Sequence, residues 1–179
     1  DPNDNRLGLV SDIYNLDATV NGMPLVEFGC YGTNIVGADG MSIGTGYNNT
    51  MDIVNSNCSP QTSINAVAAN LCANSTSQGY TDWYLPSFDE LYKMFEYNGW
   101  GSPETGLISQ RSITNNGAPI INYDYWCSTE ETFTHAYLIN SNSSASSSFY
   151  KDTQAKVRAI RTITLIVNIK YLAIGGISA

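Results

Sequence analysis

Charged side chains are scarce in this sequence, and basic ones are the scarcest. Lysine and arginine together number 8 among 179 residues, against 16 aspartates and glutamates, which gives a formal net charge of −8 at pH 7. Charged residues make up 13% of the chain, about half of the usual one quarter. A surface that binds nucleic acid needs clustered lysine and arginine, and here these residues are scattered except near the C-terminus. The composition therefore argues against a nucleic-acid partner.

Long apolar runs are also missing. A helix that spans a bilayer needs roughly 20 apolar residues, and the most apolar stretch, residues 160–177, is interrupted by Arg161, Asn168, Lys170 and two glycines. We therefore expect no membrane span. The sequence starts with Asp1 rather than methionine and shows no apolar signal segment, which suggests a processed or excised piece of a longer product.

Histidine occurs once, as His135, and no two cysteines have the Cys-x-x-Cys spacing. Structural zinc sites use cysteine and histidine ligands at such spacings, so zinc is not expected. Nucleophilic catalysis needs a base beside a serine or cysteine, and His135 lies in a polar Thr-Phe-Thr-His stretch without the rest of a triad motif. We expect a protein that is not an enzyme, with no catalytic residues and no cofactor.

Four cysteines are present, namely Cys30, Cys58, Cys72 and Cys127. In a chain so poor in lysine and glutamate they favour an oxidising, extracellular setting. Four cysteines allow three complete pairings, and sequence alone does not choose among them. Asparagine, serine and threonine number 19, 19 and 15, and with 12 tyrosines they must supply most of the exposed surface.

The order of predicted elements indicates an α+β fold. Residues 6–58 are rich in Gly, Asn, Thr and Asp, which predicts short strands joined by long turns. Residues 59–74 predict a first helix, because a capping serine and a proline precede apolar residues spaced three and four apart. A second helix is predicted from the capping box Ser87-Phe88-Asp89-Glu90 to Asn98-Gly99. Strands are then predicted at 123–129, 136–141, 149–151 and 157–169.

Two tryptophans and two arginines have structural interpretations. Trp83 and Trp126 are expected in the core, because each lies on a short aromatic strand. Asp82 is expected to form a buried hydrogen bond or to pair with Arg158 or Arg161, and contact with a ligand is the alternative. These arginines differ in parity along one strand, so they should point to opposite faces.

Four motifs in order carry a resemblance. A glycine-rich stretch from Gly29-Cys30-Tyr31-Gly32 to Ile43-Gly44-Thr45-Gly46 comes first. It is followed by Asp82-Trp83-Tyr84-Leu85-Pro86-Ser87, Tyr125-Trp126-Cys127-Ser128-Thr129-Glu130 and Val157-Arg158-Ala159-Ile160-Arg161. Over about residues 6–164 the chain resembles the Lcl C-terminal domain family of bacterial and phage surface proteins, whose function is unknown. The resemblance implies a C-type-lectin-like fold with two helices on a twisted antiparallel sheet and long loops, shared with formylglycine-generating enzymes.

The sequence also departs from this family. The family's first strand, before Leu7, is absent, which would leave an open sheet edge. The upstream chain or the apolar tail could fill that edge, and we divide the chain into a lectin-like domain, 1–164, and a tail, 165–179, with a role in assembly.

The motifs by which this fold is known to bind calcium and sugar, Glu-Pro-Asn or Gln-Pro-Asp with Trp-Asn-Asp, do not occur in this sequence. A structural calcium could use only Asp39-Gly40 with Asn48, Asn49 and Asp52.

The formylglycine-generating enzymes are oxidases that use a reactive cysteine pair. We do not expect such a pair in this chain. Cys72 and Cys127 are better explained as a helix-to-strand disulfide or as buried thiols. Glycoside hydrolysis needs two carboxylates, and the only notable pair, Glu130-Glu131, would face opposite sides of a strand. An oxidase or hydrolase that uses Cys127 or Glu130 is kept as a third hypothesis.

A polar segment supplies the predicted binding face. Residues 133–154 are dominated by Ser, Asn, Thr and Tyr, the composition of antibody loops. On strand 136–141 the family pattern places Tyr137 and Ile139 inward, and Leu138 and Asn140 outward. The alternative is a merely solvated hairpin. The predicted ligand-binding residues are His135, Asn140, Asn142, Ser144, Ser146, Tyr150, Asp152 and Gln154.

These inferences lead to two principal hypotheses on function. The first is a non-enzymatic extracellular recognition or adhesion module of a phage fibre or bacterial surface protein, which binds a saccharide or protein receptor on a cell surface. The second is a structural subunit of an extracellular fibre or virion, in which strands pair between neighbouring chains.

Overall fold

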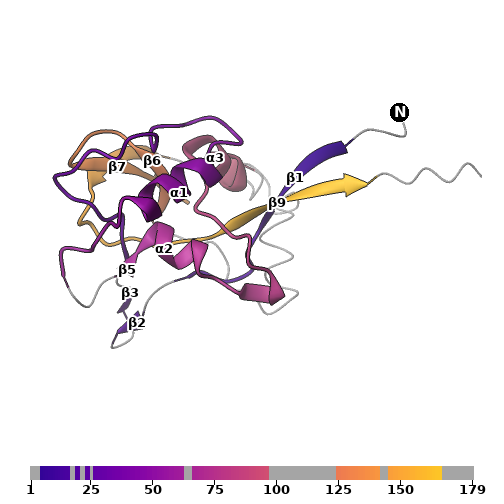
Figure 1. Cartoon of the computed structure of the whole chain (residues 1–179), viewed down its shortest axis with the longest axis horizontal. Helices are drawn as coiled ribbons and strands as arrows, with labels where there is room; N and C mark the ends of the chain where they lie inside the picture. The colour runs from indigo at the N-terminus through magenta and orange to yellow at the C-terminus, as the bar shows by residue number, and fades with distance from the viewer. Residues whose placement is uncertain are drawn as a thin grey trace, which may run out of the picture.

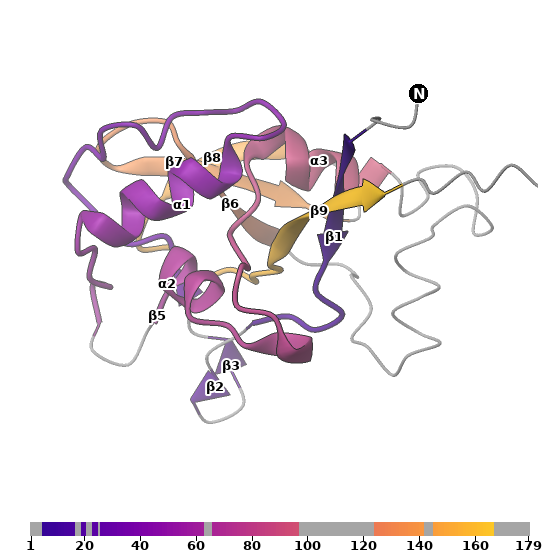
Figure 2. The same cartoon turned by 45° about the vertical axis from the view of Figure 1, so that its right-hand side comes forward.

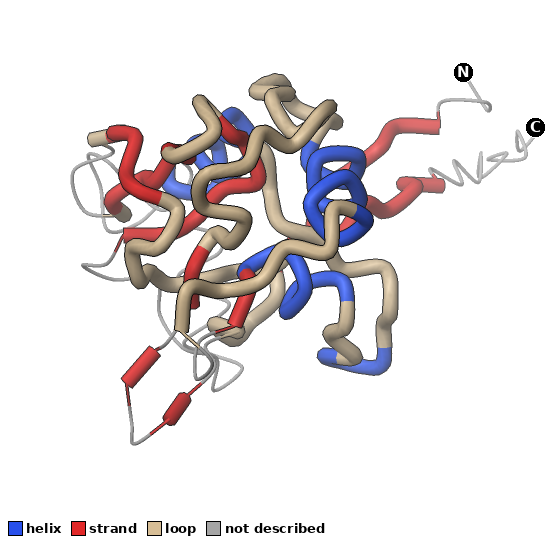
Figure 3. The backbone as a smooth tube through the Cα atoms, turned by 60° about the vertical axis from the view of Figure 1, so that its left-hand side comes forward, coloured by secondary structure: helices blue, strands red, loops and turns tan. Residues whose placement is uncertain are grey.

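A computed structural model of the 179-residue chain describes residues 5–16, 19–20, 23–24, 26–62, 66–96, 124–141 and 145–166. Within them the protein has the predicted α+β character, with short strands, helices and long connecting loops (Figure 3). The helical segments are α1 (Gly46–Asn55), α2 (Ala68–Ala73), the 3-10 turn η1 (Ser77–Gly79) and α3 (Phe88–Glu96). The strands are β1 (Asn5–Ser11), β2 (Thr19–Val20), β3 (Met23–Pro24), β4 (Val26–Glu27), β5 (Ala66–Val67), β6 (Asp124–Glu130), β7 (His135–Asn140), β8 (Ser146–Tyr150) and β9 (Ile160–Ile166).

The antiparallel sheet β6-β7-β8 has the most strands of the sheets among the described residues, and its first two strands carry buried side chains on both faces. One face packs against α1 and α2, and α1 lies in front of this sheet in Figure 2. The other face packs against α3. Because successive side chains of a strand point to opposite faces, Trp126 belongs to the first layer, and Tyr125 and Cys127 belong to the second.

Both predicted core tryptophans are buried. Trp83 is 2% exposed and Trp126 is fully buried, and the indole of Trp126 meets Phe28 edge-to-face at a centroid distance of 5.6 Å. Each indole nitrogen has a backbone acceptor, Ser77 O for Trp83 and Val26 O for Trp126. Burying a side chain of this size contributes about 4 to 6 kcal/mol of transfer free energy.

The second predicted helix is confirmed as α3, and its capping box forms as expected. The Ser87 backbone N–H donates to Glu90 Oε2 at 2.8 Å, and the Glu90 N–H donates to Ser87 Oγ at 3.4 Å. Glu90 is fully buried, and its other oxygen accepts the Gly44 N–H at 2.9 Å. The cap therefore also fixes the loop that leads into α1. The predicted end of this helix, at Asn98-Gly99, lies outside the described residues.

The first predicted helix is shorter than residues 59–74, and its predicted start is wrong. Ala66 and Val67 pair in parallel with Val26 and Glu27, so the chain is still extended there and α2 begins only at Ala68. The Gln61 N–H donates to Glu27 Oε2 at 2.6 Å, which holds the preceding turn against the same strand. A tertiary strand pair thus replaces the first turns of the expected helix.

Helix α1 was not predicted, because Gly46-Tyr47-Asn48-Asn49-Thr50 is a poor helix-forming sequence. Tertiary hydrogen bonds hold its first turns instead. Thr50 Oγ1 lies 3.1 Å from Leu85 O and accepts the Leu85 N–H at 3.0 Å. The amide of Asn49, which is 1% exposed, donates to Gly40 O at 2.7 Å.

Strands β1 and β9 form an antiparallel two-stranded ribbon, with Asn5 opposite Ile166 and Ser11 opposite Ile160. The ribbon projects from the rest of the protein (Figure 1). Residues 7–10, which lie in the region predicted to form short strands, are therefore in a strand, and β9 is its partner. Residues 167–179 lie outside the described residues, so most of the predicted tail lies there too.

Arg158, just before β9, and Arg161, within β9, point to different environments, as their parity predicted. Arg158 is fully buried, and its Nη1 donates to the backbone carbonyl of Asp12 at 2.8 Å. Arg161 forms a two-pronged ion pair with Asp82, at 2.7 and 2.8 Å, and its guanidinium lies 3.8 Å from the ring centroid of Tyr80.

The prediction that Leu138 points outward is wrong. Leu138 is 2% exposed and packs with Ala136 and Trp126, whereas Ile139 is fully buried in the layer against α3. The strand has no solvent face here, because helices cover both sides of the sheet. Within the polar segment 133–154, which was predicted to form a binding face or a solvated hairpin, Ser146 and Ser147 are exposed.

Candidate functional site

Three exposed or half-buried rings gather where β7 begins and β8 ends. We call Tyr31, His135 and Tyr150 the aromatic platform. The ring centroids of His135 and Tyr150 are 4.4 Å apart, and those of Tyr31 and Tyr150 are 6.0 Å apart. Tyr150 is 54% exposed and Tyr31 is 38% exposed. The platform therefore combines large aromatic side chains with contact to solvent, the opposite of a core position.

The pairing of β7 with β8 brings two of these rings together. His135 lies directly opposite Tyr150 in the antiparallel register, so both side chains point to the same face of the sheet. Thr134 Oγ1 lies 2.9 Å from His135 Nδ1 and fixes the orientation of the imidazole. The Thr132 hydroxyl accepts the His135 backbone N–H at 3.1 Å, which closes the tight turn between β6 and β7.

Tyr31 is held in place by its neighbours on both sides. Cys30 is joined to Cys58 by a disulfide, and the Gly32 N–H donates to Phe133 O at 2.8 Å. Cys30 and Gly32 have φ angles of 53° and 85°, the left-handed region that a glycine adopts readily and a cysteine rarely. The chain thus makes two unusual turns around Tyr31, which direct its ring toward Tyr150.

A buried ion pair lies beneath this loop. Lys151, directly after β8, is fully buried, and its Nζ donates to the carboxylate of Glu130 and to Thr33 O at 2.8 Å. The other oxygen of Glu130 accepts the Ile35 N–H at 2.8 Å. Burial lowers the pKa of Lys151, and the hydrogen bond and charge of Glu130 oppose that shift. The ion pair ties the Tyr31 loop to the sheet from below.

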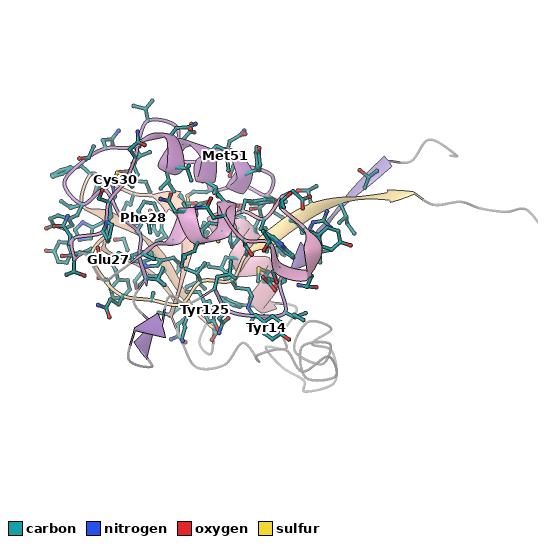
Figure 4. All side chains as sticks on the ribbon, turned by 60° about the horizontal axis from the view of Figure 1, so that its bottom comes forward. Tyr14, Glu27, Phe28, Cys30, Met51 and Tyr125 are labelled. Carbon is teal, nitrogen blue, oxygen red and sulfur yellow. A yellow bond between two sulfur atoms is a disulfide. The ribbon has the colours of Figure 1, made fainter. Side chains whose placement is uncertain are left out.

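The backbone of Lys151 reinforces the same connection. Its carbonyl accepts the N–H groups of Phe28 and Gly29 at 3.0 and 3.3 Å, and its N–H donates to Thr134 O at 2.9 Å. Cys30 and Phe28 lie on one side of the protein in Figure 4, far from Tyr14 on the other. One residue therefore connects all three segments that build the platform.

The rim of the platform is polar. Thr132, Asp152 and Gln154 are exposed, and Ser148 is half-buried on the same face of β8 as Tyr150. Beside it, a hollow of about 260 Å³ opens near the end of β6. It is lined by Asn34, Ile35, Val36, Gly37, Asp39, Glu130 and Glu131. Hydroxyl, amide and carboxylate groups surround the rings, which is an arrangement suited to binding a polar ligand.

The predicted ligand-binding residues are distributed over two ends of the hairpin. His135, Tyr150, Asp152 and Gln154 lie at the platform end. Asn140 is five residues along β7, about 17 Å at about 3.4 Å per residue, and its amide donates to Asp124 at 2.8 Å. Ser146 lies near that far end as well, opposite Ile139. The remaining two predicted residues, Asn142 and Ser144, lie outside the described residues.

Sequence reasoning missed Tyr31 as a member of the site. Its only local signal is an aromatic residue enclosed by Gly29-Cys30 and Gly32, a turn that exposes whatever side chain it carries. Phe133, 57% exposed at the tip of the β6–β7 turn, was named only as the start of the polar segment.

The cysteines are resolved into one disulfide and two buried thiols. Cys30 and Cys58 are bonded, while Cys72 and Cys127 are free and fully buried. The expected alternative of a Cys72 to Cys127 disulfide is wrong, because their side chains lie in layers on opposite faces of the sheet. Burial raises the pKa of the Cys127 thiol to about 12 and that of Cys72 well above its usual value. Neither thiol is activated as a nucleophile.

The carboxylate considered for catalysis has structural partners. Both oxygens of Glu130 are used, one by Lys151 and one by the Ile35 N–H. Glu131, its neighbour, is exposed and accepts a hydrogen bond from the Tyr137 hydroxyl at 3.2 Å. As predicted, these adjacent carboxylates face different environments.

Metal and membrane features can be stated for the described part of the chain. There, no three His, Cys, Asp or Glu side chains are grouped so that they could hold a metal ion. In the segment considered for calcium, the Asn49 amide donates to Gly40 O and to Ser128 Oγ, both protein acceptors. The helices among these residues are all too short or too polar to cross a bilayer.

Comparison with known proteins gives no relative from which to transfer a function. No family model matches this sequence. The curated proteins contain no match either.

Proposed function

We propose that this protein is a non-enzymatic extracellular recognition module with a C-type-lectin-like fold, the adhesive or receptor-binding part of a phage fibre or bacterial surface protein. The observation that carries the proposal is the aromatic platform, in which Tyr31 and Tyr150 are exposed yet held by a rigid frame. Rigid tyrosines surrounded by Ser, Thr and Asn are the contact residues of antibody-type binding surfaces, since they lose little conformational entropy on binding.

The disulfide and the buried thiols support the extracellular and non-enzymatic parts of the proposal. A disulfide at Cys30 persists in an oxidising compartment and would be reduced in most cytosols. The two free thiols are buried, with raised pKa values, and the Glu130 carboxylate is engaged by Lys151. These groups serve packing and loop anchoring rather than turnover.

A cell-attachment assay tests the proposal. The fluorescently labelled chain should bind candidate host or bacterial cells, and the variants Tyr31→Ala and Tyr150→Ala should each lose most of that binding. Tyr14→Ala is the matched control, because Tyr14 is 46% exposed and lies on the opposite side of the protein. Attachment that is unchanged in both platform variants would contradict the proposal. Asn140→Ala measures whether the binding face extends to the far end of the hairpin.

A second function, a structural subunit joined by strand pairing between chains, is favoured by the β1–β9 ribbon. Over the described residues the ribbon has two strands, and Leu9 on β1 is 41% exposed. An outer strand edge is a template for pairing with another chain. Deleting residues 165–179 should then abolish assembly in sedimentation experiments, and assembly that survives the deletion would exclude this function.

A further inference from the structure

We infer that the ligand of the aromatic platform is an uncharged sugar in its pyranose form, such as a neutral hexose on a cell-surface glycan. This inference rests on the proposed recognition function and names the chemical class that the site accepts. Four features carry it: the exposed ring faces, the polar rim, the charges around the platform, and its small size.

The ring arrangement suits a flat, partly apolar ligand of one ring. The planes of Tyr31 and Tyr150 meet at 57°, so the two rings do not stack on one another, and both remain exposed. An aromatic face carries negative charge density and attracts polarised C–H groups. One face of a pyranose ring presents several such C–H groups, and its hydroxyls point outward around the edge. Stacking on Tyr31 or Tyr150 would therefore leave those hydroxyls free to bond elsewhere.

The rim supplies partners for those hydroxyls. Asp152 and Gln154 are exposed within a few residues of Tyr150, and Thr132 lies in the turn beside His135. Carboxylate oxygens accept, an amide both donates and accepts, and a threonine hydroxyl does both. A ligand with many hydroxyls can use each of these groups.

The charges around the platform disfavour an acidic sugar. The lysine nearest to it, Lys151, is fully buried and paired with Glu130, so it offers no positive charge to a ligand. The exposed charges that flank the rings are Asp152 and Glu131, both negative. A carboxylate or sulfate on the sugar would lie beside these like charges, and the nearby Lys151 is already paired with Glu130, which costs binding free energy.

The size of the platform argues for a sugar over a protein partner. A stable protein complex buries about 800 Å² on each partner. Two partly exposed tyrosines and a half-buried imidazole supply only a small part of that area. One or two aromatic side chains are enough to hold a single sugar ring.

The test compares matched neutral and acidic sugars. The methyl pyranosides of glucose, galactose and mannose are titrated into the isotopically labelled full chain. The methyl glycosides of glucuronic, galacturonic and mannuronic acid, which carry a carboxylate at carbon 6, are titrated in parallel. Chemical-shift changes are followed by nuclear magnetic resonance. At least one neutral sugar should shift the resonances of the Tyr31, His135 and Tyr150 rings, and its acidic counterpart should bind at least about tenfold more weakly.

Three variants separate stacking from other contributions. Tyr150→Ala should weaken binding of the neutral sugar by roughly tenfold or more, as loss of a stacking ring does in other complexes. Tyr150→Phe keeps the ring and should change the affinity by less than about threefold. Tyr14→Ala should leave it unchanged. Circular dichroism confirms that each variant is folded before its affinity is compared.

The outcomes distinguish this inference from the proposed function. Equal or tighter binding of the acidic sugars would overturn the inference and leave the recognition function intact. So would platform-dependent attachment to cells that survives removal of glycans and is lost on protease treatment, since that result indicates a protein receptor. If no platform variant changes binding to sugars or to cells, both the inference and the proposed function fail.

Discussion

Lys151 and Glu130 form an ion pair inside the protein, with side chains 0% and 4% exposed, and it connects the end of β8 to the end of β6. Around it, Lys151 also holds the carbonyl of Thr33 in the loop that carries Tyr31. The same ion pair therefore contributes to the stability of the fold and holds the geometry of the aromatic platform.

Removing one partner of this pair should be costly. Lys151→Met leaves the Glu130 carboxylate buried without its cation, and the free energy of unfolding should fall by about 3 to 5 kcal/mol. Urea denaturation of Lys151→Met, Glu130→Gln and the double variant measures the coupling. We expect the double variant to lose less than the sum of the single losses. Strictly additive losses would contradict a direct interaction.

The disulfide should stabilise both the fold and the binding site. Cys30 and Cys58 are 28 residues apart in sequence, and a loop of this length corresponds to about 3 to 4 kcal/mol of chain entropy. The double replacement Cys30→Ser with Cys58→Ser should therefore melt at a lower temperature in calorimetry. It should also bind the ligand more weakly, because Tyr31 is adjacent to Cys30. The control is a reductant, which should reproduce both effects in the native protein and change nothing in the double variant.

The ion pair between Asp82 and Arg161 should give part of the acid dependence of stability. Hydrogen bonds from Arg161 lower the pKa of Asp82 below its ordinary value of 3.8. Because the folded-state pKa lies below the unfolded one, the stabilisation is complete above pH 3.8 and is lost as the pH falls through the folded-state pKa. The Asp82 side chain is 51% exposed, so the effect is at most about 1 kcal/mol.

Comparing the native protein with Asp82→Asn in urea denaturation at a series of pH values checks this expectation. The difference in unfolding free energy should be constant near neutral pH and should shrink below pH 3.8. A difference that grows on acidification would contradict the assigned sign.

Gly46 should not tolerate a side chain. A Cβ atom at this first residue of α1 would meet the Glu90 carboxylate and would lie 2.6 Å from the Ser87 nitrogen, both parts of the α3 capping box. Gly46→Ala should therefore destabilise the protein by about 1 to 3 kcal/mol despite the better helix propensity of alanine. Asn48→Ala, at an exposed position of the same helix, should stay within about 0.5 kcal/mol. Thermal denaturation of both variants provides the comparison.

Local signals in the sequence were reliable where a few neighbouring residues decide the structure. The capping box from Ser87 to Glu90 predicted the start of α3, because a helix terminus is satisfied by groups within one turn. The alternation of aromatic and β-branched residues predicted β6 and β7. Trp83 and Trp126 were placed correctly in the core, although only Trp126 lies on a strand, β6, and Trp83 precedes the isolated bridge between Tyr84 and Ile160.

The failures have a common physical cause, which is that distant residues set the local conformation. Residues Ala66 and Val67 are extended because β4 lies beside them, and α1 forms because Leu85 and Gly40 bond to its first turns. Leu138 is buried because helices cover both faces of its sheet. The spacing of hydrophobic residues along the sequence does not encode these contacts.

The candidate site shows the same limit. His135 and Tyr150 were both predicted, yet their contact follows from the register of β7 and β8. Tyr31 was missed because only the disulfide at Cys30 and the buried lysine bring its loop to Tyr150. The sequence shows the three residues of such a site separately. It does not show the distances between them, which depend on the fold.

The two-sided burial of β6 and β7 has a consequence for how the protein opens. Both strands contribute side chains to each of the two hydrophobic layers. Water can therefore not enter one layer while the other stays intact. Backbone amides of these strands, Trp126 and Ile139 among them, should exchange with deuterated water only through complete unfolding. Amides of the projecting ribbon, which has no such double cover, can exchange through local fraying while the body of the molecule remains folded.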